Sequence, residues 1–283
     1  KPLIFIIDEL DRCRPNYSVL LLEQIKHFFS VPNIVFVLSI DKTQLGNAIC
    51  GVYGSEKIDS NEYLKRFIDI EYSIPEAKKG EFFNYLYEYF GYDTFFNSSE
   101  RNMYSGFEHD RGNFVMAGET LIGNLTLRQQ EKILSHTRIA LRTFQHNNYL
   151  IPTLFIFLVY IKTIHEEFYY QLSNKKLSIN EMHDRFFEVV EPFLNEENKR
   201  LFVQIEAHLL KFYENFKSEY RGNTGLIKRN ATEDKYELNI NSKIDNQDLL
   251  QFLTSGRLAY DYSELKLSHF LDKLNLTDNI KIN

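Results

Sequence analysis

The first 75 residues contain two short apolar runs separated by an amphipathic segment. Residues 3–7 and 34–38 are uninterrupted apolar runs, which are typical of strands covered on both faces. Pro15 and Asn16 mark a turn and a helix start, and apolar residues then follow helical spacing across 21–29. A strand, a helix and a strand with short connections predict a βαβ unit, and therefore a parallel sheet.

A third segment, residues 68–74, alternates between apolar and polar residues. Ile68, Ile70, Tyr72 and Ile74 are separated by Asp69, Glu71 and Ser73. A period of two with one polar face predicts a strand near the edge of the sheet, and Pro75 ends it.

Beyond Pro75 the pattern predicts helices. Residues 80–90 carry aromatic side chains at helical spacing, and residues 125–144 form a long amphipathic pattern. The apolar stretch 150–161 is shorter than the ~20 residues that a membrane-spanning helix needs, so we expect a buried helix. Residues 92–123 are rich in Gly and Asn, and we expect a loop or irregular segment there.

The last third of the chain is also expected to be helical. Ser178 and Glu181 have the spacing of a capping box at a helix start. Residues 219–246 are polar and predict a mobile region, with a short strand in "YELNIN". Two further helices are expected near residues 248–252 and 262–274.

Composition favours a reducing compartment and excludes a highly basic protein. The net charge of −6 argues against wholesale binding of nucleic acid, although the modest basic cluster of residues 211–229 leaves a nucleic-acid-acting accessory as an alternative. Cys13 and Cys50 are too few for a disulfide framework, so we expect a cytoplasmic protein. The chain starts with "KPLIFII", without a leader, and we expect it to be a fragment that begins inside a domain.

Carboxylates follow the first two predicted strands. Asp8 and Glu9 come at the end of the first strand, and Ser39 and Asp41 at the end of the second. Ligands of open α/β sheets bind at this edge. A carboxylate there can hold a hydrated Mg²⁺, and a neighbouring glutamate can activate water for phosphoryl transfer. The alternative is that Asp8 or Asp11 caps the following helix.

The stretch "FIIDELDRC", continued by "IVFVLSIDKTQL" and "YLKRFIDIEYSIP", resembles the second half of a KAP-family P-loop NTPase domain. The resemblance is close from Leu3 to about Pro75 and loose beyond it. It implies that Asp8 is the Mg²⁺ ligand and Glu9 the water-activating base. Ser39 or Asp41 would be the sensor near the γ-phosphate. The family usually has Asp where Glu9 stands, and Glu is the form of AAA-type enzymes.

The same resemblance implies two arginines as candidate site residues. Arg66 resembles the arginine that AAA-type domains present to a neighbouring subunit, which implies self-association through the NTPase domain. The alternative is a surface pair between Arg66 and Glu62. Arg128 is the candidate lid arginine for the phosphates, in competition with Arg138 and Arg142. We expect Arg12 to pair with an acid of its own turn.

The expected fold class is therefore α/β: half of a P-loop NTPase parallel sheet followed by an α-helical lid and a helical C-terminal region. We place the Walker B half of the core at residues 1–78, the lid at 79–172 and the C-terminal region at 173–283. The phosphate-binding motif G-x-x-x-x-G-K-[S/T] does not occur in the 283 residues. The family places this motif upstream of the Walker B strand, in some members with an intervening membrane-inserted segment. The resemblance therefore implies that the motif lies upstream here, and we expect the 283 residues alone to be inactive.

The resemblance implies ATP and Mg²⁺ as ligands and ATP hydrolysis by the full-length protein. The first hypothesis is a nucleotide-driven switch whose helical region signals to an effector or partner protein, as in bacterial anti-phage defence. The second hypothesis is an interaction scaffold with a degenerate or incomplete nucleotide site. An intact or degenerate phosphate-binding loop upstream would discriminate between them.

Overall fold

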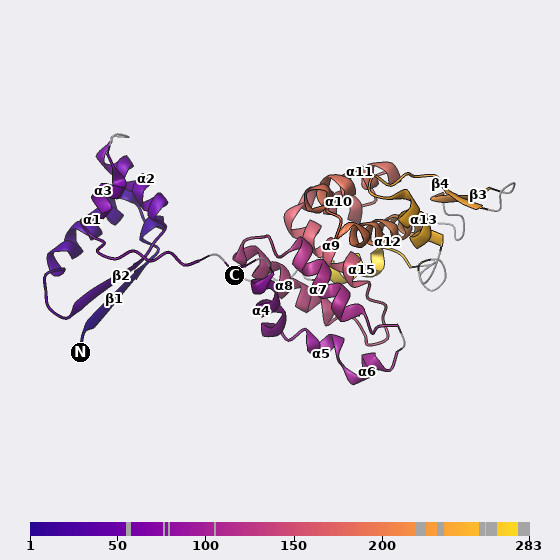
Figure 1. The fold of residues 1–283 in the computed structure, drawn as a ribbon, viewed down its shortest axis with the longest axis horizontal. Helices are drawn as coiled ribbons and strands as arrows, with labels where there is room; N and C mark the ends of the chain where they lie inside the picture. The colour runs from indigo at the N-terminus through magenta and orange to yellow at the C-terminus, as the bar shows by residue number, and fades with distance from the viewer. Residues whose placement is uncertain are drawn as a thin grey trace. The chain divides into compact units, whose positions relative to one another are not determined.

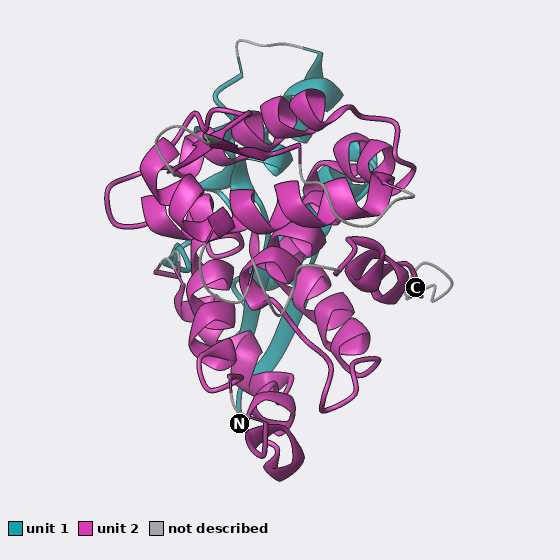
Figure 2. Cartoon of the chain, turned by 90° about the vertical axis from the view of Figure 1, so that its right-hand side faces the viewer, with its two compact units in different colours: residues 1–76 teal, residues 77–283 magenta. Residues whose placement is uncertain are grey.

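The structure is a computed structural model that divides into two compact units. Unit 1 is Lys1–Glu76 and unit 2 is Ala77–Asn283 (Figure 2). The residues that the structure describes are 1–54, 58–75, 77–78, 80–104, 106–218, 225–230, 235–254, 258 and 265–276. The boundaries that we expected at residues 78 and 172 stay predictions.

Unit 1 contains the predicted βαβ unit. Strands β1 (Leu3–Asp8) and β2 (Ile34–Ser39) are parallel (Figure 1). They are joined by η1 (Leu10–Arg12), α1 (Pro15–Ile25) and η2 (Lys26–Phe28). Pro15 starts α1, where a fixed φ suits the first turn and the missing N–H costs nothing.

Two further helices complete unit 1. Helix α2 (Lys42–Tyr53) ends at Gly54, which has a φ of 65°, and helix α3 is Ser60–Leu64. Helices α1 and α2 pack together through a small core. That core consists of Leu10, Val19, Leu22, Ile25, Leu45, Ile49, Leu64 and Phe67.

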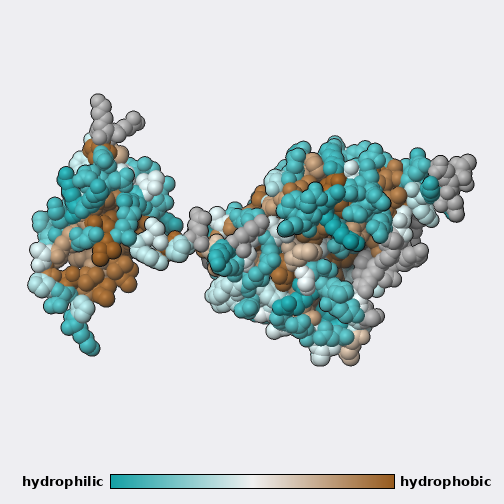
Figure 3. Space-filling model, in the orientation of Figure 1, coloured by the Kyte–Doolittle hydropathy of each residue, from teal (hydrophilic) through white to brown (hydrophobic). Residues whose placement is uncertain are grey.

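The expectation that both strands are covered on both faces is wrong for the described residues. Along β2 the burial alternates, so that Phe36 and Leu38 pack against the core whereas Val35 and Val37 are 45% exposed. Side chains of β1 from Leu3 to Ile6 are also exposed. Figure 3 shows apolar side chains gathered on the surface of this unit. The core of unit 1 therefore covers one face of β2, whereas β1 is exposed on both faces from Leu3 to Ile6.

The predicted third strand is also wrong. Residues 68–75 carry no strand assignment, and Ile70, Tyr72 and Ile74 are 80–88% exposed. Alternation fixes which side chains share a face, but a strand also needs a neighbour for its N–H and C=O groups. The sheet that contains β1 and β2 has no third strand among the described residues.

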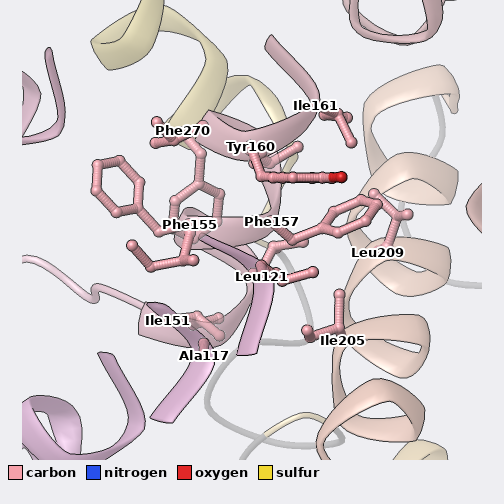
Figure 4. Packing of buried hydrophobic residues seen from close by; sticks show 14 of the residues in the cluster. Ala117, Leu121, Ile151, Phe155, Phe157, Tyr160, Ile161, Ile205, Leu209 and Phe270 are labelled. Carbon is pink, nitrogen blue, oxygen red and sulfur yellow. The ribbon is translucent and has the colours of Figure 1, made fainter. Parts of the chain in front are cut away.

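Unit 2 is helical and surrounds one apolar helix. Its helices are α4 (Glu81–Tyr89), α5 (Asp93–Phe96), α6 (Ser99–Asn102), α7 (Asp110–Leu121), α8 (Leu127–Leu141), α9 (Pro152–Ile164), α10 (Glu166–Ser173), α11 (Ile179–Val190), α12 (Lys199–Lys217), α13 (Asn246–Thr254) and α15 (Ser268–Asn275), with the 3-10 turn η3 (Glu191–Phe193). Figure 4 shows side chains of α9 among residues of α7, α12 and α15. The predicted buried helix at 150–161 is confirmed.

The predicted loop at residues 92–123 is wrong, because it contains α5, α6 and α7. Buried Phe96 and Phe114 stabilise this segment more than its Gly and Asn content weakens it.

Arg101 is fully buried between the rings of Phe95 and Phe107, and its guanidinium donates to Asp110 at 2.5 Å. A core that closes around an arginine cannot be inferred from composition.

The other predictions for unit 2 are largely confirmed. The capping box of Ser178 and Glu181 starts α11, and a second one, Thr126 with Gln129, starts α8. The strand expected in "YELNIN" is β4 (Lys235–Leu238), which pairs with β3 (Ile227–Asn230), a strand that was not predicted. Residues 219–224, 231–234 and 262–264 of the predicted elements lie outside the described residues. None of the described helices is long and apolar enough to cross a membrane.

Candidate functional site

The strand register places Asp8 and Ser39 side by side. Asp8 of β1 is the register partner of Ser39 of β2, and the N–H of Glu9 donates to the carbonyl oxygen of Ser39 at 3.2 Å. All three residues are exposed. A carboxylate, a hydroxyl and a second carboxylate therefore share the carboxyl edge of the sheet, where ligands of open α/β sheets bind.

A fixed turn follows Glu9. Leu10 is 1% exposed in the core of unit 1, and the buried hydroxyl of Ser18 donates to its carbonyl oxygen at 2.7 Å. Glu9 itself has a φ of 57°, in the left-handed region that a side chain disfavours. The core thus anchors the turn on one side while Glu9 remains at the surface.

Glu9 pairs with Arg12, as expected for an acid of the same turn. The Nη1 of Arg12 donates to Oε1 of Glu9 at 2.5 Å, and both side chains are 61% exposed. The alternative that Asp8 or Asp11 caps the next helix is wrong, because η1 and α1 have no side-chain cap. Oδ1 of Asp8 instead accepts from the N–H of Glu9 at 2.9 Å.

Asp41 has a structural task at the same edge. Its Oδ1 accepts from the N–H groups of Thr43 at 2.9 Å and Gln44 at 3.0 Å, which makes it the N-cap of α2. An N-cap of this kind stabilises a helix by about 1 kcal/mol. Of the two residues proposed for the sensor position, Ser39 therefore lies in register with Asp8, whereas Asp41 caps a helix.

The sequence did not reveal an ion pair beside the second strand. Lys42, the first residue of α2, donates to Glu71 at 2.6 Å, and Glu71 belongs to the extended segment 68–75. The two residues are 29 positions apart, so no local pattern could predict the pair. The pair brings the carboxylate of Glu71 to Lys42, the residue that follows Asp41.

Arg66 lies over an aromatic ring rather than against Glu62. Its guanidinium carbon is 5.7 Å from the centre of the Tyr63 ring, and Glu62 pairs with Lys65 at 2.9 Å. Tyr63 donates to Glu23 at 3.3 Å, and burial, followed by its hydrogen bond with Tyr53, raises the pKa of Tyr63. Arg66 is exposed, and its predicted role toward a neighbouring subunit stays a prediction.

The lid arginine belongs to unit 2. Arg128 lies exposed in the first turn of α8, whereas Arg138 and Arg142 lie in the last turn and at the C-cap of the same helix. A cation in the first turn opposes the helix dipole, so Arg128 does not stabilise α8 where it stands. Its predicted contact with phosphates stays a prediction.

The edge of the sheet fits a magnesium ion that is held with phosphate. Mg²⁺ in phosphoryl-transfer sites is held by one or two carboxylates together with waters and substrate phosphates, rather than by a cage of protein ligands. Among the described residues no three His, Cys, Asp or Glu side chains gather as a metal cage. The exposed carboxylate of Asp8, next to Ser39, is a donor of the hard oxygen type that this ion takes.

Comparison with known protein families identifies a matching family model. The model of the KAP family P-loop domain matches residues 1–146, which is more than half of the 283 residues. The match covers unit 1 and continues through α8 of unit 2. No curated protein and no solved structure matched the chain.

Proposed function

Because the chain belongs to the KAP family of P-loop domains, we propose that it binds ATP with Mg²⁺ at the carboxyl ends of β1 and β2 and hydrolyses it. One observation carries the proposal: the register that sets Asp8 beside Ser39, with Glu9 following on a fixed turn. The family supports nucleotide binding, and this arrangement supports hydrolysis at that edge.

Each of the three side chains has a separate task in this proposal. Asp8 would hold Mg²⁺, which would supply positive charge against the phosphates of the nucleotide. Glu9 orients the attacking water and takes its proton. The Ser39 hydroxyl donates a hydrogen bond to the γ-phosphate or to the water, which couples the second strand to the state of the nucleotide.

The arginines supply positive charge for the transition state in the proposed reaction. Arg66 would reach the nucleotide of a second copy, which makes hydrolysis depend on self-association, and Arg128 would close over the phosphates. Hydrolysis would then switch the helical region between two states that an effector protein distinguishes. A part in defence against phage is the biological setting that the family resemblance suggests.

ATP turnover by the full-length protein tests this proposal. Glu9→Gln should lower kcat about 100-fold or more, because a positioned base contributes 10²–10⁴-fold, while ATP binding persists. Glu62→Gln is the matched control, since it removes a carboxylate that pairs with Lys65 instead. Turnover that survives in Glu9→Gln would refute the assignment of the base.

An interaction scaffold is the second candidate. The observation that favours it is the ion pair that occupies Oε1 of Glu9. A full-length protein that neither binds nor hydrolyses ATP, but still captures a partner through its helical region, would support this candidate.

A further inference from the structure

The backbone of Glu9 is held in a conformation that its side chain disfavours. Its φ is 57° and its ψ is 26°, a region that glycine adopts freely and that residues with a Cβ avoid. Strained residues persist only where their surroundings fix them, and they concentrate at functional sites. Here the N–H of Glu9 donates to Ser39 and Asp8, and its carbonyl oxygen accepts from the N–H of Arg12 at 3.0 Å.

The side chain of Glu9 is held as well. Nη1 of Arg12 donates to Oε1 at 2.5 Å from the short helix η1, which is anchored through buried Leu10 and the hydrogen bond from Ser18. The backbone of Arg12 is therefore held in place by η1, three residues along the chain from Glu9. This turn therefore fixes the backbone conformation of Glu9 and the position of its carboxylate oxygen Oε1.

The stability of the fold does not explain this pair. Both partners are 61% exposed, and ion pairs between exposed side chains contribute little to folding. A catalytic base, by contrast, gains from a third group that fixes its direction, as the residues that orient bases in other active sites do. Phosphoryl transfer depends mainly on positioning, so the direction of the water-holding carboxylate matters more than its basicity.

We infer that Arg12 is a positioning residue for Glu9. Its guanidinium holds Oε1, so that Oε2 is the oxygen that holds the attacking water. The inference rests on the proposed function, since it assigns a task to Arg12 only if Glu9 acts as the base. In this inference Arg12 belongs to the site but acts through Glu9, without touching the nucleotide or the metal.

The test is steady-state ATP turnover by the full-length Arg12→Ala protein. We expect kcat to fall about 10- to 100-fold, as for a reacting group misplaced by about 1 Å, with KM for ATP and the melting temperature unchanged. Arg12→Lys should recover part of the loss, because a lysine can still donate to the carboxylate. Arg14→Ala is the matched control, since Arg14 is an exposed arginine two residues further along.

A double-mutant cycle separates positioning from a general structural role. In a Glu9→Ala background, Arg12→Ala should cause no further loss of turnover, because the arginine acts through the glutamate. An equal loss in both backgrounds, a wild-type kcat in Arg12→Ala, or a rise in KM alone would overturn the inference.

The failure of this inference differs from the failure of the proposed function. If Glu9→Gln is inactive while Arg12→Ala turns over ATP at the wild-type rate, only the role of Arg12 is wrong. If Glu9→Gln turns over ATP at the wild-type rate, or the full-length protein has no turnover, both assignments fall together.

Discussion

Two apolar runs of similar composition lie in opposite environments. Each residue of α9 from Leu154 to Ile161 is at most 4% exposed, whereas the residues of β1 from Leu3 to Ile6 are 44–73% exposed. Helix α9 contacts α7, α8, α10, α12 and α15, which surround it. In unit 1 the small core covers one face of β2 and leaves β1 exposed from Leu3 to Ile6. An apolar run shows a preference for burial, and only its neighbours decide whether that preference is met.

The two units also differ in core size and in where the candidate site lies. Unit 2 has an extensive core and unit 1 a small one, yet the carboxylates of the candidate site lie in unit 1. Segments that bind ligands are commonly drawn from the less stable parts of a protein. We therefore expect unit 2 to resist unfolding longer than unit 1, and four experiments test this comparison.

The largest effect is expected from emptying the core of unit 2. Phe157→Ala in α9 removes a side chain that is 0% exposed and should lower the free energy of unfolding by about 3–5 kcal/mol. Phe5→Ala in β1, where the ring is 44% exposed, should cost only about 1 kcal/mol. Hydrogen exchange resolved by peptide measures each unit separately. Equal losses would break the comparison.

Acid should weaken unit 2 selectively. Burial lowers the pKa of His208 to about 4 from its usual value of 6.5. The unfolded chain therefore takes up a proton near pH 6.5, and the folded chain only near pH 4. His208 alone should lower the free energy of unfolding by about 3 kcal/mol across that window. His165 and His269, whose pKa values burial also lowers, act in the same direction, and Glu214, whose pKa burial raises, opposes them.

Urea unfolding at pH 7, 5.5 and 4 measures this dependence. In His208→Gln the loss between pH 6.5 and 4 should shrink, because the group that titrates is absent. A slope as steep in the variant as in the wild type would show that His208 is not its source.

An added methyl group should have opposite effects on stability at a buried glycine of unit 2 and at an exposed glycine of unit 1. A Cβ on Gly118 of α7 would lie 2.1 Å from Cζ of Phe83, so Gly118→Ala should destabilise unit 2 by about 1–3 kcal/mol. A Cβ on Gly51 of α2 meets nothing within 4 Å, and Gly51→Ala should stabilise unit 1 by up to about 1 kcal/mol. Melting temperatures of the two variants suffice. A stabilised Gly118→Ala would contradict the packing around α7.

The smallest effect concerns the strained residue of the candidate site. Glu9→Gly relieves the disfavoured φ of 57°, whereas Glu9→Ala retains it, so the glycine variant should be more stable by about 1 kcal/mol. Both variants lose the carboxylate, and the difference therefore reports on the backbone alone. Equal melting temperatures would mean that Glu9 is not strained in solution.

Local patterns predicted much of the fold. Apolar runs and the short connections gave the parallel strands, and the spacing of Ser178 and Glu181 gave the start of α11. The apolar stretch that forms α9 was predicted as a buried helix because it is too short to span a membrane. The proximity of Asp8 and Ser39 also followed, since parallel strands end at the same edge of a sheet.

What the sequence could not supply depends on neighbours far along the chain. The exposure of β1 depends on what lies against its open face, and residues 68–75 stay unpaired for want of a neighbouring strand. The pair of Lys42 and Glu71 and the burial of Arg101 likewise join distant segments. The sensor role that the resemblance implies for Asp41 stays a prediction, and the local N-cap that its side chain forms on α2 does not test it.

Hydrogen exchange of full-length Glu9→Gln, with and without ATP and Mg²⁺, tests the central claim most directly. The variant should bind the nucleotide without consuming it, so exchange reports on the bound state. The account predicts slower exchange in peptides that cover residues 8–13 and 39–42, at the carboxyl ends of β1 and β2. Unchanged exchange in both of these segments, with ATP bound, would contradict it.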